Sequence, residues 1–346
     1  MEQESHWQLF NTSWTLHRLS PLHHGKDFET LLDNPAALKA YATRLRDQLT
    51  GDILAGLHAS ATTAEDDALS KTGALKKCLW QSISAGAQGR RAGPSFPGIL
   101  VTLEYENNTY KAALLADAEP ENQREGSTFF PLLLTKLPNT LRQTFISFLS
   151  TNFDTYCSNL RLPSTFLCKG LEDFVDELRN GRGPSGRSAA NETIEEGIKE
   201  LQLTLAFSPS IAPALRTLNI TISRASLIAF LRDEAPKSKR TLKQKLRSPL
   251  IGNLTAYLET HLAMQLDLDG SSQNQTSRKH VRLSKIACAA FVLGGEGRMK
   301  LVVGAEPAAD DQPDDAREQS SPALHASEML LEMVVRRAII GDEKTT

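Results

Sequence analysis

The stretch GILVTLEYENNTYKAALLA, residues 98–116, decides the fold class of this chain. Its two halves, 98–105 and 109–116, are rich in residues that favour strands, and the residues between them, Glu106, Asn107 and Asn108, favour a tight turn. The pattern predicts an antiparallel β-hairpin. The segment TFFPLLLT, residues 128–135, predicts a further strand soon after it.

Amphipathic helices flank these strands in the sequence. Asn34 and Pro35 form a helix start, and an apolar stripe follows as far as Gly51, where we expect that helix to end. Pro138 opens a second helix, and residues 164–179 predict a third. The stripes of the first two helices consist of Leu38, Tyr41, Leu45 and Leu49, and of Leu141, Phe145 and Phe148. Strands interleaved with helices indicate the α+β class.

The segment 9–19 alternates between apolar and polar residues and stops at Pro21, so it predicts a strand with Trp14 and Leu16 in the core. Four potential metal ligands surround its end: His17, His23, His24 and Asp27. Side chains along a strand point to alternate faces, so these four need not converge, and the chain has no second histidine cluster. We expect the histidines at the rim of the fold and no bound metal.

The C-terminal half has the same mixed character. Residues 199–207 and 215–223 read as strands, and 225–233 and 249–262 as helices. The segment 280–303, HVRLSKIACAAFVLGGEGRMKLVV, predicts a long strand, a turn at Gly294–Gly297 and a returning strand. We expect the long strand at a sheet edge, where its backbone would recruit a strand of another chain. The residues of this candidate partner edge are Val281, Leu283, Ile286, Phe291 and Leu293.

A Gly-, Ser- and Arg-rich stretch, residues 180–191, predicts a linker that divides the chain near residue 185. We expect an N-terminal α+β domain, 1–185, with a mobile insertion at 59–74. The C-terminal α+β domain, 186–346, would hold the hairpin 280–303, a disordered acidic loop at 304–321 and a last amphipathic helix. The apolar residues of that helix, Leu330, Leu331, Val334 and Ile339, would cover the protein's own sheet.

Composition excludes several classes of protein. Apolar residues make up 40% and charged residues 23%, as in soluble globular proteins, and the net charge of −2 creates no global basic field for nucleic acid. The chain has no apolar run of some 18 residues and no signal-like start, so we expect neither secretion nor a membrane span. Its four cysteines lie far apart, as in reduced proteins of the cytosol or nucleus.

No enzyme signature occurs in the chain. The G-x-S-x-G, H-E-x-x-H and Walker A patterns are absent, and the glycines at 294–297 lie between two predicted strands, as in a hairpin turn. Paired acids such as Asp66 and Asp67 fall in polar segments, where they are ordinarily solvated. We therefore expect no catalytic residues, no cofactor and no metal.

One segment is strongly basic. Residues 237–247, KSKRTLKQKLR, contain Lys237, Lys239, Arg240, Lys243, Lys245 and Arg247 and no acidic residue. Such a run is a solvated loop, a nuclear import signal or a patch for the phosphate backbone. It holds no aromatic residue, which disfavours a stacking platform for single strands.

The segment LFNTSWTLHRLSPLHHGKDFETLLDNPAALKAYATRLRDQLTGDIL, which begins at Leu9, resembles the N-terminal signature of the fungal centromere protein L family. SKIACAAFVLGGEGRMKLV, which begins at Ser284, is similar to that family's C-terminal hairpin. The likeness rests on apolar and turn residues, covers roughly 9–57 and 249–303, and is looser between these ranges.

The resemblance implies an α+β protein with curved, largely antiparallel sheets flanked by helices, and it implies no catalysis. It implies a nuclear subunit of the inner kinetochore, at the centromere, paired through sheet edges with a centromere protein N-type subunit. Other inner-kinetochore subunits and the centromeric nucleosome are further implied partners. A direct DNA contact would lie at a local basic patch such as this run, for which a solvated loop and an import signal remain the alternatives. The rival hypothesis is a recombination-associated protein of similar sheet architecture that binds DNA itself.

Overall fold

The structure is a computed structural model of all 346 residues. It describes residues 8–26, 28–54, 72–83, 96–117, 126–180, 194, 198–210, 213–231, 250–262, 280–303 and 322–340. The basic run 237–247, the linker near 185, the loop 304–321, Asp27 and most of the insertion 59–74 lie outside these residues. Their predicted roles stay predictions.

The chain forms two compact units. Unit 1 comprises residues 1–160 and 332–346, and unit 2 comprises residues 161–331. The division differs from the boundary that we predicted near residue 185. The physical reason is helix α5 (Ser164–Asn180), which packs on strand β11 (Val281–Ala287) of unit 2: Ser164 Oγ accepts a hydrogen bond from Leu283 N at 3.1 Å. Helix α5 therefore belongs with the C-terminal strands.

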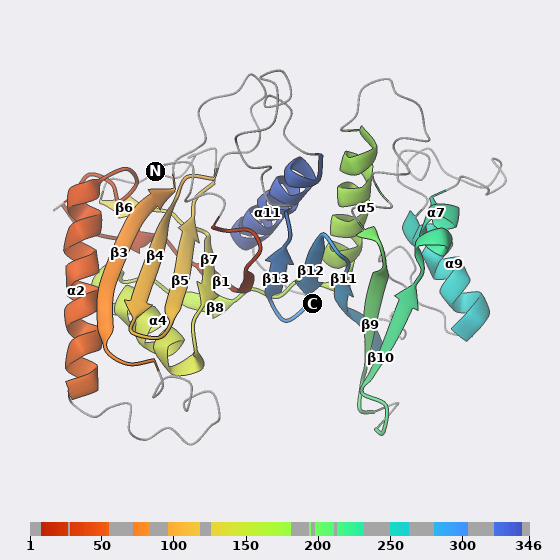
Figure 1. Ribbon diagram of the computed structural model, residues 1–346, viewed down its shortest axis with the longest axis horizontal. Coiled ribbons are helices and arrows are strands. Elements are labelled where there is room, and N and C mark those ends of the chain that lie inside the picture. Colours follow the sequence, from red (N-terminus) through yellow and green to blue (C-terminus); the bar gives the residue numbers. More distant parts are fainter. Residues whose placement is uncertain are drawn as a thin grey trace. The chain divides into compact units, whose positions relative to one another are not determined.

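Antiparallel strands form the sheet of unit 1 (Figure 1). Its order is β1 (Ser13–Leu19), β7 (Leu132–Lys136), β5 (Thr109–Leu115), β4 (Gly98–Tyr105) and β3 (Leu75–Ile83). Strand β8 (Cys157–Asn159) also pairs with β1, and β2 (Leu22–His23) pairs with β6 (Ser127–Thr128). The hairpin predicted at 98–116 is confirmed as β4 and β5, with Tyr105 N donating to Asn108 O at 2.9 Å.

Two helices supply the core that covers one face of this sheet. Helix α2 (Pro35–Leu54) begins after Asn34, whose Oδ1 accepts a hydrogen bond from Ala37 N at 3.1 Å, and α4 (Asn139–Phe153) begins after Pro138. The predicted stripes are buried in one cluster with side chains of the sheet. The expected end of α2 at Gly51 is wrong, because the helix continues to Leu54.

Strand β1 carries Trp14 and Leu16 into the core, as predicted. The expectation that the histidines lie at the rim is wrong for two of them. His17 is 2% exposed, with Nε2 3.1 Å from Thr135 Oγ1, and His24 is 5% exposed, with Nε2 3.0 Å from Thr128 Oγ1. Both are buried because strands flank β1 on two sides and β6 pairs with β2. His23 alone of the three is exposed.

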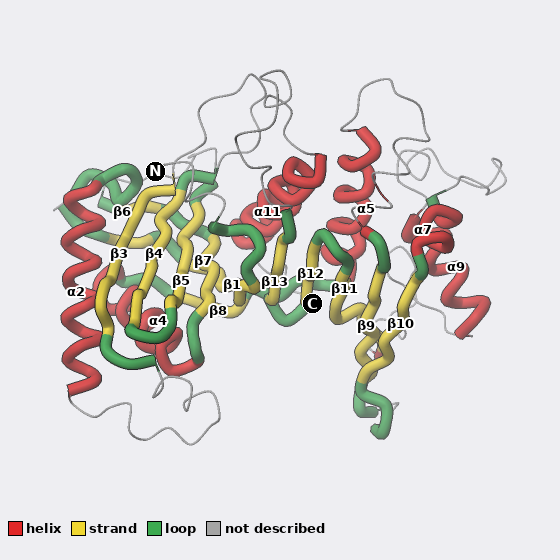
Figure 2. Tube along the Cα trace, viewed as in Figure 1, coloured by secondary structure: helices red, strands yellow, loops and turns green. Residues whose placement is uncertain are grey.

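The strands of unit 2 are antiparallel and follow the order β10 (Thr217–Ile222), β9 (Leu201–Phe207), β11, β12 (Phe291–Gly294) and β13 (Arg298–Leu301). Helices α5, α7 (Arg224–Phe230) and α9 (Leu250–Leu262) belong to this unit. Figure 2 shows β9 between β10 and β11. The largely antiparallel strands of both units, with their helices, confirm the α+β class.

The predicted long strand at 281–293 is wrong in one respect. The small residues Cys288, Ala289 and Ala290 turn the chain back, with Cys288 N donating to Phe291 O at 2.8 Å, so the run forms two antiparallel strands, β11 and β12. The turn predicted at Gly294–Gly297 and the returning strand, β13, are confirmed.

Helix α11 (Pro322–Ile340) is the predicted C-terminal helix, and Leu330, Leu331 and Val334 are buried on it. The division between the two units falls within this helix. Of the helices that the structure describes, none has an apolar stretch long enough to cross a membrane.

Candidate interaction surfaces

The predicted partner edge lies inside the sheet of unit 2. Strand β11 pairs with β9 on one side and β12 on the other, and β12 pairs with β13. Even the bulge between Leu283 and Lys285 has its backbone engaged, since Leu283 N and O bond to Ser164 Oγ and Ser284 O accepts from Gly295 N. The edge placement is therefore wrong.

The side chains of that predicted edge are core residues. Leu283, Ile286, Phe291 and Leu293 are 2% exposed or less, and the Phe291 ring lies edge-on against Phe174 of α5, with centroids 4.9 Å apart. Val281 alone is half-buried. The alternation of apolar residues along 281–293 indicates that their side chains are buried. It does not indicate which strands lie beside this segment.

Among the described strands of unit 2, β10 pairs with β9 alone. Phe207 N donates to Arg216 O at 2.9 Å, so the backbone of Arg216 faces β9. In an antiparallel ladder the facing direction alternates from one residue to the next. The N–H and C=O groups of Thr217, Asn219 and Thr221 therefore point away from β9, to the open side.

Strand β10 has the side-chain character of a pairing edge. Its sequence, TLNITI, has no charged residue and no proline, and Thr217, Asn219 and Thr221 are exposed while Leu218 and Ile220 are half-buried. Natural edge strands that avoid association ordinarily carry lysine, proline or a bulge. The β10 edge has none of these features within Thr217–Ile222.

A second open edge lies in unit 1. Strand β3 pairs with β4, and the residues that the structure describes place no strand on its other side. Tyr105 N donates to Asn108 O, in the turn just before β5, so by alternation the backbone of Glu104, Thr102 and Leu100 faces β3. Their partners on β3 are Lys77, Leu79 and Gln81, whose backbone N–H and C=O groups face β4. The backbone groups of Cys78, Trp80 and Ser82 therefore point to the open side.

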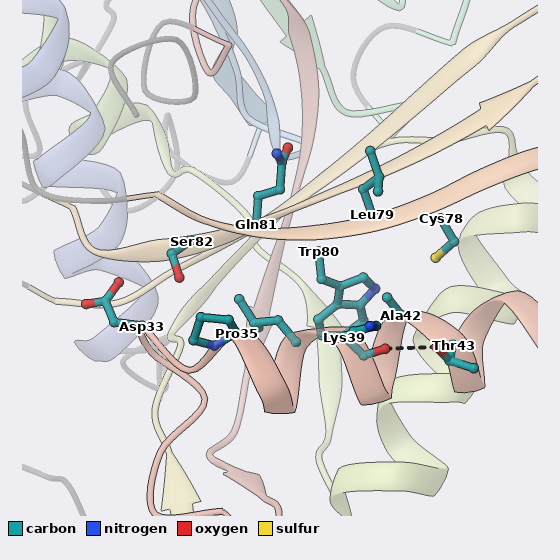
Figure 3. A pocket seen from close by; sticks show the side chains of 11 residues that line it. Asp33, Pro35, Lys39, Ala42, Thr43, Cys78, Leu79, Trp80, Gln81 and Ser82 are labelled. Carbon is teal, nitrogen blue, oxygen red and sulfur yellow. Dashed lines mark hydrogen bonds between the residues drawn. The ribbon is translucent and has the colours of Figure 1, made fainter. Parts of the chain in front are cut away.

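A groove of about 790 Å³ lies between this edge and α2 (Figure 3). One wall is formed by Pro35, Leu38, Lys39, Ala42 and Thr43 of α2, the other by Cys78–Ser82 of β3, and Asp33 lines one end. In Figure 3, Trp80 and Ser82 point from β3 to the helix, while Leu79 and Gln81 point to the opposite face. Leu79 is 38% exposed there.

The polar groups of the groove are distinctive. Trp80 is 7% exposed, and its indole Nε1 is buried without a hydrogen-bond partner of ordinary geometry. Burial raises the pKa of the Cys78 thiol to about 12, against the opposing effects of the Trp80 N–H and the positive charge of Arg46. The groove thus has a neutral thiol and an indole N–H, and Lys39 and Asp33 both line it.

A smaller cavity of about 500 Å³ lies in unit 1 near the end of β1. Arg18, His23, Phe129 and Tyr156 are among its lining residues, and Tyr156 is 74% exposed. Arg18 Nη2 donates to Ile339 O at 3.3 Å, which fixes the guanidinium against the end of α11. None of the described residues that line this cavity carries a carboxylate.

The described histidines of this cluster are not grouped as metal ligands, and Asp27 lies outside the described residues. In the described part of the chain, no group of three or more His, Cys, Asp or Glu side chains is arranged to hold a metal ion. Burial, with a smaller effect of Arg142, lowers the pKa of His17 to about 4, so this imidazole is neutral in the folded protein at pH 7. His17 and His24 instead bond to threonine hydroxyls of neighbouring strands.

Sequence reasoning missed both open edges. For β3 a signal was present, because Lys76 and Lys77 are adjacent and exposed at the start of the strand, as edge strands often have them. For β10 the uncharged run at 217–222 was compatible with either an edge or an interior strand.

Comparison with known proteins bears on the identity of the chain. No curated protein matches it. The family model described as Centromere protein L matches residues 8–339, which include every strand that the structure describes. The match spans nearly the whole sequence, and the chain therefore belongs to the centromere protein L family.

Proposed function

We propose that this chain is a non-enzymatic, structural subunit of the inner kinetochore that pairs with a centromere protein N-type subunit through the β10 edge. Membership of a centromere and kinetochore family supports the setting. The observation that carries the pairing is the open, uncharged β10 strand, with the backbone groups of Thr217, Asn219 and Thr221 directed outward. Adding a strand there would satisfy these groups and extend the sheet of unit 2.

The proposed setting is the nucleus, at the centromere, with other inner-kinetochore subunits and the centromeric nucleosome as further partners. In this proposal the basic run from Lys237 to Arg247 borders nucleosomal DNA or serves nuclear import. A pairing made by backbone hydrogen bonds and apolar contacts is insensitive to salt, whereas a phosphate contact weakens as the salt concentration rises.

The test is co-expression with a centromere protein N-type subunit, followed by size-exclusion chromatography with light scattering at low and high salt. We expect a one-to-one complex that survives high salt. Thr221→Pro deletes one outward N–H without touching the β9 ladder, and it should weaken the complex at least about tenfold, whereas Thr221→Val keeps that N–H and should bind within about twofold of wild type.

Three outcomes contradict this proposal. A complex that is equally tight with Thr221→Pro would remove β10 from the interface. Failure of the wild-type chain to form any complex would reject the pairing itself. A lone chain that binds DNA in a salt-sensitive way would favour the rival, a recombination-associated DNA-binding protein.

A further inference from the structure

We propose that the groove between α2 and β3 binds an extended peptide segment of another protein, which adds as a strand to β3. The segment carries an apolar residue over Trp80 and a carboxylate two positions away, over Cys78. This site lies in unit 1 and is separate from β10, and it does not depend on the function proposed above.

The backbone provides the first element of the site. Every second residue of this part of β3 faces outward: Cys78, Trp80 and Ser82 present their backbone N–H and C=O groups along the open side of the strand. Hydrogen bonds to these groups would hold any extended chain, whatever its sequence. A strand bound there has every second side chain on the α2 face, because side chains alternate along a strand.

The groove provides the second element, which is selective for side chains. A residue opposite Trp80 enters the space between Trp80 and the helix residues Leu38 and Ala42, where an aliphatic side chain meets apolar walls. The neighbouring residues of the bound strand point to the other face, beside the exposed Leu79. Apolar side chains of the bound strand, one over Trp80 and one beside Leu79, would both be removed from water.

Charge decides the chemistry of the next position. Lys39 lines the groove at its middle, and the charge of Arg46 reaches Cys78 at the end where Thr43 lies. The single carboxylate among the lining residues, Asp33, lies at the opposite end, beside Ser82. A carboxylate over Cys78 would lie away from Asp33, near Lys39 and near Arg46, whose guanidinium also pairs with Asp47 at 2.8 Å, whereas a lysine there would be repelled.

The same charges disfavour a second copy of this chain as the occupant. Strand β3 contributes Lys76 and Lys77 to its own edge and has no acidic residue. A β3 strand of a second copy would bring two further lysines and would not supply the carboxylate that the groove favours.

The probe is the β-prone peptide Thr-Thr-Thr-Ile-Val-Glu-Thr-Thr with a fluorescent label, measured by anisotropy against the full chain. Its counterpart has Lys in place of Glu. We expect the Glu peptide to bind at least about tenfold more tightly than the Lys peptide, with the preference reduced or reversed in Lys39→Glu.

A matched pair of variants tests the groove. Thr43 and Thr50 are both exposed on α2, and each donates a hydrogen bond to the carbonyl four residues earlier, at 3.0 Å and 2.9 Å. Only Thr43 lines the groove. Thr43→Trp should fill it and weaken the Glu peptide at least about tenfold, and Thr50→Trp should leave the Kd within about twofold.

A second pair tests the strand addition. Ser82→Pro removes one outward N–H, and Ser82→Thr keeps it, so only the proline variant should lose affinity. Equal binding of the two peptides to the wild-type chain, absence of binding by both, or indifference to Thr43→Trp would overturn the proposal. Concentration-dependent dimerisation that Thr43→Trp abolishes would assign the groove to a second copy instead. Thr221→Pro should leave peptide binding unchanged, which separates this site from β10.

Discussion

His17 is a polar residue whose imidazole ring is buried in the interior of unit 1. It is buried beside Thr135 Oγ1, and its lowered pKa follows first from that burial and then from the nearby charge of Arg142, while a hydrogen bond with Asn159 opposes both. A buried neutral histidine couples the stability of the fold to pH. The alternation of residues 9–19 predicted the strand, but it could not show that strands pair on both sides of it.

The sign of this coupling follows from the two pKa values of His17. The folded pKa, about 4, lies below the unfolded value of 6.5, so between them the unfolded chain binds more protons. The contribution to stability is therefore complete above about pH 6.5 and is lost as the pH falls toward 4. Burial lowers the pKa of His24 also, which acts in the same direction.

We predict that unit 1 loses about 2 kcal/mol of unfolding free energy through His17 between pH 7 and pH 5. His17→Gln keeps a polar group for Thr135 without the titration, so its stability should fall less over this range. Urea unfolding of both proteins at the two pH values measures the difference. Parallel losses in both would show that other groups cause the acid sensitivity.

At the scale of the element, α2 illustrates how a helix end is decided. The Asn34 cap and the stripe from Leu38 to Leu49 were readable from the sequence, because local hydrogen bonding and a period of 3.6 residues specify them. The end of this helix was not readable from the sequence, which wrongly predicted it at Gly51. Glycine often follows a helix, but at Gly51 the chain keeps its helical course to Leu54.

Two glycines of unit 1 should respond oppositely to alanine. Gly51 lies inside α2 with open space around its Cβ position, so Gly51→Ala should stabilise by about 0.5–1 kcal/mol through the reduced entropy of the unfolded chain. At Gly98, the first residue of β4, a Cβ would lie 2.4 Å from Leu114 O in the neighbouring strand. We expect Gly98→Ala to cost more than about 2 kcal/mol, because a backbone atom must move.

Denaturant midpoints of the two variants check this prediction. A stabilised Gly98→Ala protein would contradict the close approach of β4 and β5. A destabilised Gly51→Ala protein would contradict the continuation of α2 through residue 51.

At the scale of the whole molecule, each unit has a sheet with an open strand, and the two edges differ in chemistry. The β10 edge is uncharged, whereas the β3 edge begins with two lysines and adjoins the groove of α2. An uncharged edge can pair broadly, whereas the lysines of β3 disfavour strand pairing in general and leave an acidic segment as the occupant that their charge favours. In our two proposals these edges therefore bind two different partners.

Hydrogen exchange of the free chain should show an alternating pattern at both edges. The amides of Thr217, Asn219 and Thr221 point outward and should exchange faster than those of Leu218 and Ile220, which face β9. In β3 the amides of Cys78 and Ser82 should exchange faster than those of Leu79 and Gln81. Exchange measured by mass spectrometry with residue-level fragmentation tests this. Uniform protection along either strand would show that its edge is already covered.

The sequence by itself determined the α+β class, the hairpin at 98–116, the helix starts at Asn34 and Pro138, and the burial of Trp14 and Leu16. These features depend on turn chemistry, capping and periodicity, which act over a few residues. The resemblance of both chain ends also pointed to the centromere protein L family, to which the chain belongs.

The tertiary structure alone decided which strands lie at the edges and which residues share a groove. Leu283, Ile286 and Phe291 carry the same apolar alternation that an edge strand with one buried face would have, but β9 and β12 occupy both sides of their segment. Trp80 and Lys39 share a groove because α2 packs along β3. Strand neighbours are fixed by long-range pairing, which no local pattern encodes, and for that reason the interaction surfaces could be located only in the folded chain.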